Sequence, residues 1–181
     1  MAPVIGGGVS SPFESQRAIV FVDGTNLFYR LEAAKLKMPS LSKLFPHHLQ
    51  GRQLHRIYLY TVREQFERAQ AVQGDGFCHG IRCVFGDGVP TGDGNVKEKG
   101  VDALLVADLV YHAAMKNYDY ALVVSVDTDF AHAIRRVEAF GCKTGVLGIC
   151  AEVPERLRDS CDEAFFMHAG QLQQHGFAKP A

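Results

Sequence analysis

Short apolar runs recur along the chain and are separated by segments of mixed character. They lie at residues 18–22, 54–62, 80–86, 120–126 and 143–149, with one more candidate at 163–169. Runs of this length that are rich in β-branched and aromatic residues are typical of strands. Most of them do not alternate apolar with polar residues, so we expect strands that helices cover on both faces.

Helical patterns occupy the intervals between these runs. Residues 27–37, 63–73 and 130–141 are compatible with helices, and Pro154 begins a short helical turn. A helix over residues 102–115 is predicted because apolar residues recur at the 3, 4 and 8 offsets of one helical face, namely Val101, Leu104, Leu105 and Leu109. The glycine-rich stretch 87–95 is expected to be a surface loop.

This order of elements predicts an α/β fold, a three-layer sandwich with a mostly parallel central sheet and right-handed crossovers. Neither a repeat nor a linker interrupts residues 18–168, and a chain of 181 residues needs no second domain. Residues 1–17 are expected to form a flexible N-terminal tail, and residues 169–181 a C-terminal tail.

Composition narrows the class of protein. Hydrophobic residues make up 47% of the chain and charged residues 22%, as in soluble globular proteins, and we expect no membrane span. The N-terminus lacks the pattern of a signal peptide, and five cysteines without a CxxC pair fit free thiols in a reducing cytoplasm. A net charge of -1 excludes a globally basic nucleic-acid binder but permits a local basic rim.

Aspartates follow two of the strongest apolar runs. Asp23 comes directly after residues 18–22, while Asp127 and Asp129 follow residues 120–126. Ligands of open α/β sheets bind beyond the carboxyl ends of the strands, so neighbouring strands would bring these carboxylates together. Asp102 opens a predicted helix and would be directed at the same crevice.

Clustered carboxylates raise one another's pKa unless a cation compensates their repulsion. Aspartate oxygens without a nearby His or Cys favour a hard divalent ion, Mg²⁺ or Mn²⁺, over zinc. Such an ion leaves coordination positions for phosphate oxygens and an attacking water, which predicts phosphodiester hydrolysis with either one or two metals. The alternative is structural: Asp23 could cap a helix or turn, and Asp127 and Asp129 could cap the helix that follows them.

Three blocks of the sequence resemble those of the NYN domain family, a group of PIN-like ribonucleases. They are VFVDGTNLFYRL, KEKGVDALLVADL and YALVVSVDTDFAHAIRRVEAFGCKTGVLG, in the expected order across residues 18–168. The resemblance implies a parallel sheet of order 3-2-1-4-5, with room for a sixth strand, and metal-dependent cleavage of RNA.

The resemblance also assigns roles to individual residues. Catalytic and metal-binding positions fall on Asp23, Asp102, Asp127 and Asp129. Asn26 would orient a metal-bound water or a phosphate, and Ser125 and Thr128 would hydrogen-bond carboxylates or phosphate. The family's usual SGDSDF is SVDTDF here, so Val126 replaces a glycine and puts activity in doubt more than fold.

Basic and aromatic residues near these blocks are candidates for contact with RNA. Lys97 and Lys99 precede Asp102 and could bind phosphate. A basic rim could also include Arg63, Arg135 and Arg136. Tyr29 or Phe28 could stack on a base, although aromatic residues in a first helix usually belong to the core.

Two other functions remain open at this stage. FVDGTN resembles the DxDGT block of haloacid-dehalogenase-like phosphatases, but Phe21 stands where that mechanism needs a nucleophilic aspartate. The domain could also bind RNA in a regulatory role and cleave it poorly. A homodimer is possible, although no residue indicates its interface.

Overall fold

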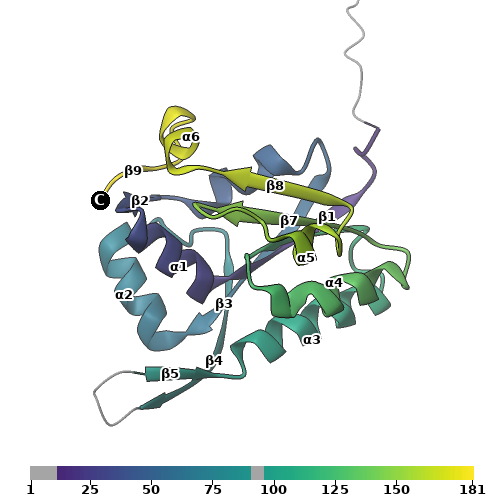
Figure 1. Ribbon diagram of the computed structural model, residues 1–181, viewed down its shortest axis with the longest axis horizontal. Coiled ribbons are helices and arrows are strands. Elements are labelled where there is room, and N and C mark those ends of the chain that lie inside the picture. Colours follow the sequence, from purple (N-terminus) through teal and green to yellow (C-terminus); the bar gives the residue numbers. More distant parts are fainter. Residues whose placement is uncertain (1–11, 91–95) are drawn as a thin grey trace, which may run out of the picture.

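The protein is an α/β sandwich built on one seven-stranded sheet (Figure 1). A computed structural model describes residues 12–90 and 96–181. The strand order is β5-β4-β3-β1-β6-β7-β8. The strands are β1 (Arg17–Asp23), β3 (Gln53–Val62), β4 (Arg82–Pro90), β5 (Val96–Lys99), β6 (Tyr120–Val124), β7 (Lys143–Ile149) and β8 (Glu163–Met167).

The predicted strand order is confirmed, with β8 as the sixth parallel strand. In β1, Val22 lies opposite Leu59 of β3 and Val124 of β6, and all three strands run in the same direction. β1 and β6 are therefore neighbours, and their carboxyl ends meet at one edge of the sheet. We call this the carboxyl edge, and the opposite edge, where the parallel strands begin, the amino edge.

Helices cover both faces of the sheet. One face carries α1 (Gly24–Ala33) and α2 (Arg63–Gln73), and the other α3 (Val101–Ala114), α4 (Ala131–Glu138) and α5 (Glu155–Arg158). Within β1, Val20 and Val22 pack toward α1 while Ile19 and Phe21 pack toward α3. Both sets are buried, which explains why the strand is apolar at successive positions.

The expected surface loop at residues 87–95 is partly wrong. β4 continues to Pro90 and pairs antiparallel with β5, so that Asp87 lies opposite Lys99. This pairing satisfies backbone groups that an edge strand would otherwise expose. Residues 91–95 lie outside the part of the chain that the structure describes.

Residues 169–181 are not a tail but fold back onto the domain. They form α6 (Ala169–Gln174) and β9 (Lys179–Pro180), and β9 pairs with β2 (Leu36–Lys37). Leu172 and Ala178 are buried in the core. The first helix also ends at Ala33, before the predicted residue 37, because Lys35 adopts a positive φ and the chain then enters β2. Residues 1–11 of the expected N-terminal tail lie outside the described residues.

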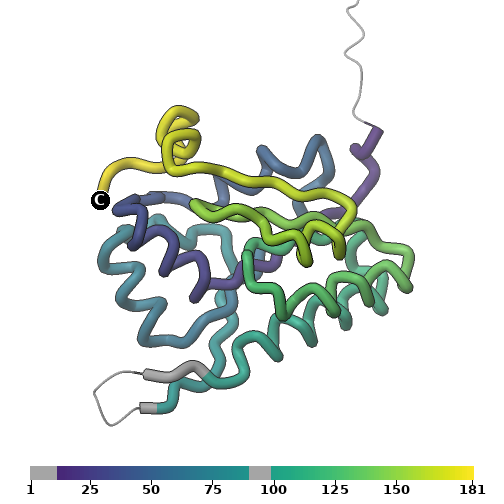
Figure 2. The backbone as a smooth tube through the Cα atoms, viewed as in Figure 1, coloured from purple at the N-terminus to yellow at the C-terminus, as the bar shows by residue number. Residues whose placement is uncertain are grey.

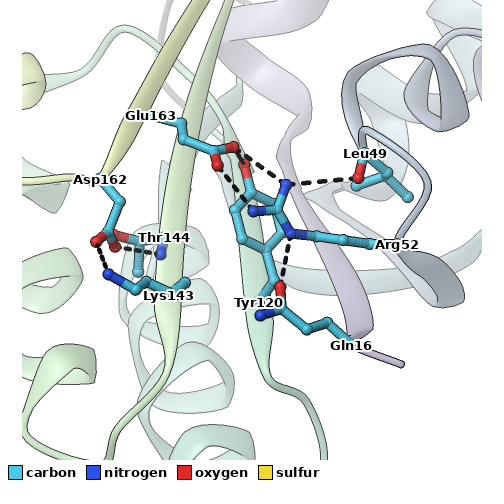
Figure 3. Close-up of polar contacts among 8 residues, drawn as sticks. All are labelled: Gln16, Leu49, Arg52, Tyr120, Lys143, Thr144, Asp162 and Glu163. Atoms are coloured by element: carbon cyan, nitrogen blue, oxygen red, sulfur yellow. Dashed lines mark hydrogen bonds and ion pairs between the residues drawn. The ribbon is translucent and has the colours of Figure 1, made fainter. Parts of the chain in front are cut away.

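Ion pairs stabilise the amino edge of the sheet (Figure 3). The Arg52 side chain, 2% exposed, precedes β3 and donates to Glu163 at the start of β8, with Nη2 2.7 Å from Oε1. The Tyr120 hydroxyl donates to the same carboxylate at 2.8 Å, and the guanidinium lies 3.8 Å from the centre of the Tyr120 ring. Lys143 at the start of β7 forms an ion pair with Asp162, which directly precedes β8.

No helix in the described part of the chain has the length and apolar character needed to cross a membrane. The longest, α3, has 14 residues.

Candidate acidic active site

Asp23 ends β1 and begins α1 at the carboxyl edge. Its carboxylate is buried, with Oδ1 accepting from the backbone N–H of Asn26 at 3.0 Å and Oδ2 accepting from the Ser125 hydroxyl at 2.8 Å. Gly24 permits this position because a Cβ there would lie 2.6 Å from the backbone oxygen of Tyr60. The DGTN segment thus turns the chain sharply against β3 and holds Asp23 in place.

Ser125 joins the ends of the two central strands. It follows β6, donates to Asp23, and accepts from the backbone N–H of Asp127 at 3.0 Å. Asp127 in turn accepts from the N–H of Asp129 at 2.9 Å, which begins a 3₁₀ turn over Thr128–Phe130. The Asp127 backbone and the Asp23 carboxylate therefore contact the same hydroxyl.

The structure confirms the capping interpretation of both Asp23 and Asp127. Asp23 caps α1 and Asp127 caps the 3₁₀ turn. A carboxylate has about four lone-pair sites, so one or two accepted hydrogen bonds leave capacity for a further ligand. Capping fixes the orientation of these groups and is compatible with a functional role.

Asp102 approaches the carboxyl edge from α3, on the face of the sheet opposite to α1. It lies in the first turn of α3, after Gly100 in the left-handed conformation. Gly86 of β4 allows this approach, since a Cβ there would be 2.7 Å from the Val101 side chain. The residue is exposed, yet partial desolvation together with the charges of Asp127 and Asp129 raises the pKa of its carboxyl.

Asp23 and Asp102 are each affected by the charges of other aspartates at the carboxyl edge. Burial raises the pKa of Asp23 to about 6 against the lowering effect of its two hydrogen bonds, and the charges of Asp102 and Asp127 add to the increase. The repulsion expected from the sequence is therefore present.

Ion pairs between described residues are unevenly distributed between the two edges of the sheet. All three ion pairs found among the described residues lie at the amino edge and involve Asp119, Asp162 and Glu163. None of the four aspartates at the carboxyl edge has such a partner within the described part of the chain. Among the described residues, the charge of these four aspartates is therefore not neutralised by a direct ion pair.

The donor set fits a hard cation in chemistry, although it is not a closed cage. Within residues 12–90 and 96–181, no group of three or more His, Cys, Asp or Glu side chains is arranged so that it could hold a metal directly. Magnesium commonly keeps several waters and uses only one or two protein carboxylates. An ion at this edge would be held partly through its waters by Asp23, Asp102, Asp127 and Asp129.

The predicted substrate-binding residues differ in how far the structure describes them. Asn26 contributes its backbone to the Asp23 cap, and Thr128 is half-buried in the 3₁₀ turn. Lys99 is exposed at the end of β5, beside the start of α3. The Lys97 side chain lies outside the described residues. Roles for these four residues in binding remain predictions.

Val126 follows β6, and its side chain packs against the neighbouring strand β7. Its side chain is 9% exposed and lies over Gly148 of β7, where a Cβ would be 3.2 Å from Val126 Cγ1. The bulk that replaces the usual glycine is therefore directed at least partly toward β7.

The predicted basic rim is split. Arg63 begins α2 at the carboxyl edge, with its guanidinium 4.5 Å from the centre of the Phe85 ring. Arg135 and Arg136 lie in the last turn of α4, where Arg135 donates to the backbone oxygen of Asp159. Since α4 leads away from the carboxyl edge, Arg63 is the one of these three arginines that lies at that edge.

A groove between α1 and α2 has no counterpart in the sequence pattern. It has a volume of about 810 Å³ and includes Tyr29, which the sequence marked, together with Arg68 and Val72, which it did not. Residues from two helices form it jointly, so no local pattern indicates it.

A parallel α/β sandwich whose two central strands end in a shared acidic cluster is typical of PIN-like nucleases. The model of the NYN domain family matches residues 17–168, and the chain belongs to this family. NYN domains are generally nucleases of the PIN-like class.

Solved structures support the fold. A protein of unknown function from Vibrio parahaemolyticus is similar with a TM-score of 0.63 and 18% identity, over 86% of this chain and 95% of that one. A putative oxidoreductase from Parabacteroides merdae matches with a TM-score of 0.36 and 11% identity, over 87% of this chain and 32% of that one, which is too distant to support an argument. No match to the chain is found among curated proteins.

Proposed function

We propose that the protein is a metal-dependent ribonuclease that hydrolyses RNA phosphodiester bonds at Asp23, Asp102, Asp127 and Asp129. The observation that supports the proposal is that Asp23 and Asp127 follow the neighbouring strands β1 and β6, while Asp102 of α3 interacts electrostatically with both and none of them has an ion-pair partner among the described residues. Membership in a family of PIN-like nucleases agrees with it.

Mg²⁺ or Mn²⁺ is the expected cofactor, held by Asp23, Asp102, Asp127 and Asp129 partly through coordinated waters. Such an ion, when bound, lowers the pKa of a coordinated water and offsets charge on the scissile phosphate. The chain's own contribution is orientation: Ser125 fixes Asp23 and the backbone at Asp127, while α3 presents Asp102. Lys97, Lys99 and Asn26 would contact the phosphates of the substrate, with Thr128 beside them.

A regulatory domain that binds RNA without cleaving it is the second candidate, and electrostatics disfavours it. A protein that only binds a polyanion gains nothing from clustered negative charge unless a cation is present. A phosphatase mechanism lacks its nucleophile, because a phenylalanine, Phe21, stands in place of the reactive aspartate. Phe21 is fully buried, and its ring centre lies 5.9 Å from that of Tyr58 and 5.8 Å from that of Tyr118. The free cysteines fit the cytoplasmic location that we propose.

Cleavage of labelled RNA tests the proposal. Single-stranded and structured RNA would be incubated with the protein in Mg²⁺, Mn²⁺ or EDTA, beside Asp23→Asn and Asp127→Asn variants. Asp75→Asn is the matched control, because Asp75 is an exposed loop aspartate outside the acidic edge. We expect metal-dependent cleavage that both site variants lose and the control keeps. RNA binding without cleavage in any metal would instead support the regulatory role.

A further inference from the structure

The groove between α1 and α2 opens at the acidic edge. Both helices begin at the carboxyl ends of their strands and lie side by side on one face of the sheet (Figure 2). Thr25, two residues after Asp23, lines the groove, as does Gln65 in the first turn of α2. Ala181 and Leu36 line it as well, in the β2 region beyond the end of α1. The groove therefore leads away from the candidate site along the two helices.

Exposed apolar side chains stand on both walls of the groove. Tyr29 of α1 is 64% exposed and Val72 of α2 is 57% exposed. Phe28 is instead half-buried and packs against Phe77, with ring centres 5.8 Å apart, so it forms part of the core. Of the two aromatic residues that the sequence marked, only Tyr29 presents its ring for stacking. Arg30 carries a guanidinium 5.5 Å from the centre of that ring.

Two cationic side chains line the groove beside the exposed apolar residues. They are Lys35 and Arg68, and the negative groups of the described lining are the Glu32 side chain and the terminal carboxylate of Ala181. Aromatic rings beside cations are the usual components of surfaces that bind single-stranded nucleic acid, because bases stack on the rings while the cations neutralise phosphates. Tyr29 together with Lys35 and Arg68 supplies both components in this groove.

We propose that this groove binds unpaired nucleotides of the RNA that extend from the scissile phosphate, with one base stacked on Tyr29 and a phosphate near Arg68. The inference rests on the proposed function for the nature of the ligand and adds a site to it. Stacking does not read base identity, so the groove would select single-stranded RNA without strong sequence preference.

Fluorescence of 2-aminopurine tests the stacking directly. Short single-stranded RNA carrying this base at successive positions would be titrated with the Asp127→Asn protein in Mg²⁺, so that binding is measured without cleavage. We expect quenching at one or two adjacent positions on the same side of the cleavage site. Tyr29→Ala should abolish this quenching and weaken binding about 5- to 100-fold, while Tyr29→Phe should retain both.

Two further variants complete the experiment. Tyr111→Ala removes an equally accessible tyrosine, 57% exposed on α3, and should bind RNA like the parent protein. Arg68→Ala should weaken binding and reduce the slope of log K against log salt by roughly 0.7, the value for one single-strand phosphate contact.

The outcomes separate this inference from the proposed function. Metal-dependent cleavage by the wild-type protein, with Tyr29→Ala and Tyr111→Ala equal in affinity and quenching, would overturn the groove and leave the nuclease intact. Such a result would favour a protein partner as its occupant. Quenching that depends on Tyr29, without cleavage in any metal, would support the groove and overturn catalysis. Absence of RNA binding altogether would overturn both.

Discussion

Ser125 is the single side chain that links the two halves of the acidic edge. Its hydroxyl is buried and donates to Asp23 while it accepts from the backbone of Asp127. Ser125→Ala should destabilise the fold by about 1–3 kcal/mol at pH 7.5, since a buried carboxylate oxygen and a backbone N–H both lose their partner. Urea unfolding measures the effect. Ser125→Thr keeps the hydroxyl and should cost less, and an equal loss in both variants would contradict this role.

Asp23 makes the stability of the protein depend on pH. Burial raises its pKa to about 6 in the folded state, so its proton is bound more tightly there than in the unfolded chain. The stability that this contributes is complete below pH 4 and is lost as the pH rises through about 6. The shift corresponds to about 3 kcal/mol between these limits.

Asp23→Asn should therefore stabilise the metal-free protein at pH 7.5 by roughly 1–2 kcal/mol and change little at pH 4. An asparagine removes the buried charge and still caps α1, although it satisfies Ser125 less well. Denaturant unfolding in EDTA at the two pH values gives the comparison. A variant that gains stability while losing cleavage would separate the catalytic role of Asp23 from its role in folding. Equal destabilisation at both pH values would show that Asp23 is mainly structural.

At the scale of elements, a cluster of three side chains at the amino edge links β3, β6 and β8. Arg52 before β3 contacts Glu163 of β8 and Tyr120 of β6 (Figure 3). Arg52→Met should cost about 3–5 kcal/mol, because it leaves the Glu163 carboxylate with the Tyr120 hydroxyl but without its cationic partner. The double variant Arg52→Met, Glu163→Gln should be less destabilised than Arg52→Met alone. A double-mutant cycle followed by urea unfolding measures the coupling, and simple additivity would contradict it.

The elements show which parts of the fold a sequence pattern can predict. Strands buried on both faces, such as β1 and β6, give continuous apolar runs and were identified correctly. β5 was missed because VKEK has no apolar pattern and forms only through pairing with β4. The C-terminal segment was missed for a similar reason: Leu172 and Ala178 are too few to indicate a helix that packs on the core.

The sequence likewise predicts some parts of the candidate site and misses others. Asp23 and Asp127 were predicted because each ends a strong strand, and parallel strands end at a common edge. The neighbourhood of β1 and β6 came from the family resemblance, since periodicity alone does not give strand order. The groove could not be predicted, because Tyr29 and Val72 are brought together only by the packing of α1 on α2.

Over the described part of the molecule, the acids that form ion pairs lie at the amino edge of the sheet, and the four aspartates at the carboxyl edge form none. Asp119, Asp162 and Glu163 are paired at the amino edge, where they stabilise the ends of strands. The carboxyl edge has no such pairs among the described residues, and the pKa of Asp23 and of Asp102 is raised there. An added cation should stabilise acids that have no ion-pair partner more than acids that already have one. The two edges should therefore respond differently to metal.

Thermal unfolding with and without Mn²⁺ tests this division. At a Mn²⁺ concentration about a hundredfold above Kd, the midpoint of the wild-type protein should rise by about 5 °C or more at pH 7.5. The increase should be much smaller at pH 5, where a proton on Asp23 competes with the ion.

Asp102→Asn should lose most of the increase in the unfolding midpoint. Asp119→Asn should lower the midpoint without metal, because it breaks the pair with Arg17, yet keep the full increase. Equal metal responses in the Asp102 and Asp119 variants would mean that the ion binds elsewhere, and the acidic edge would then need another explanation.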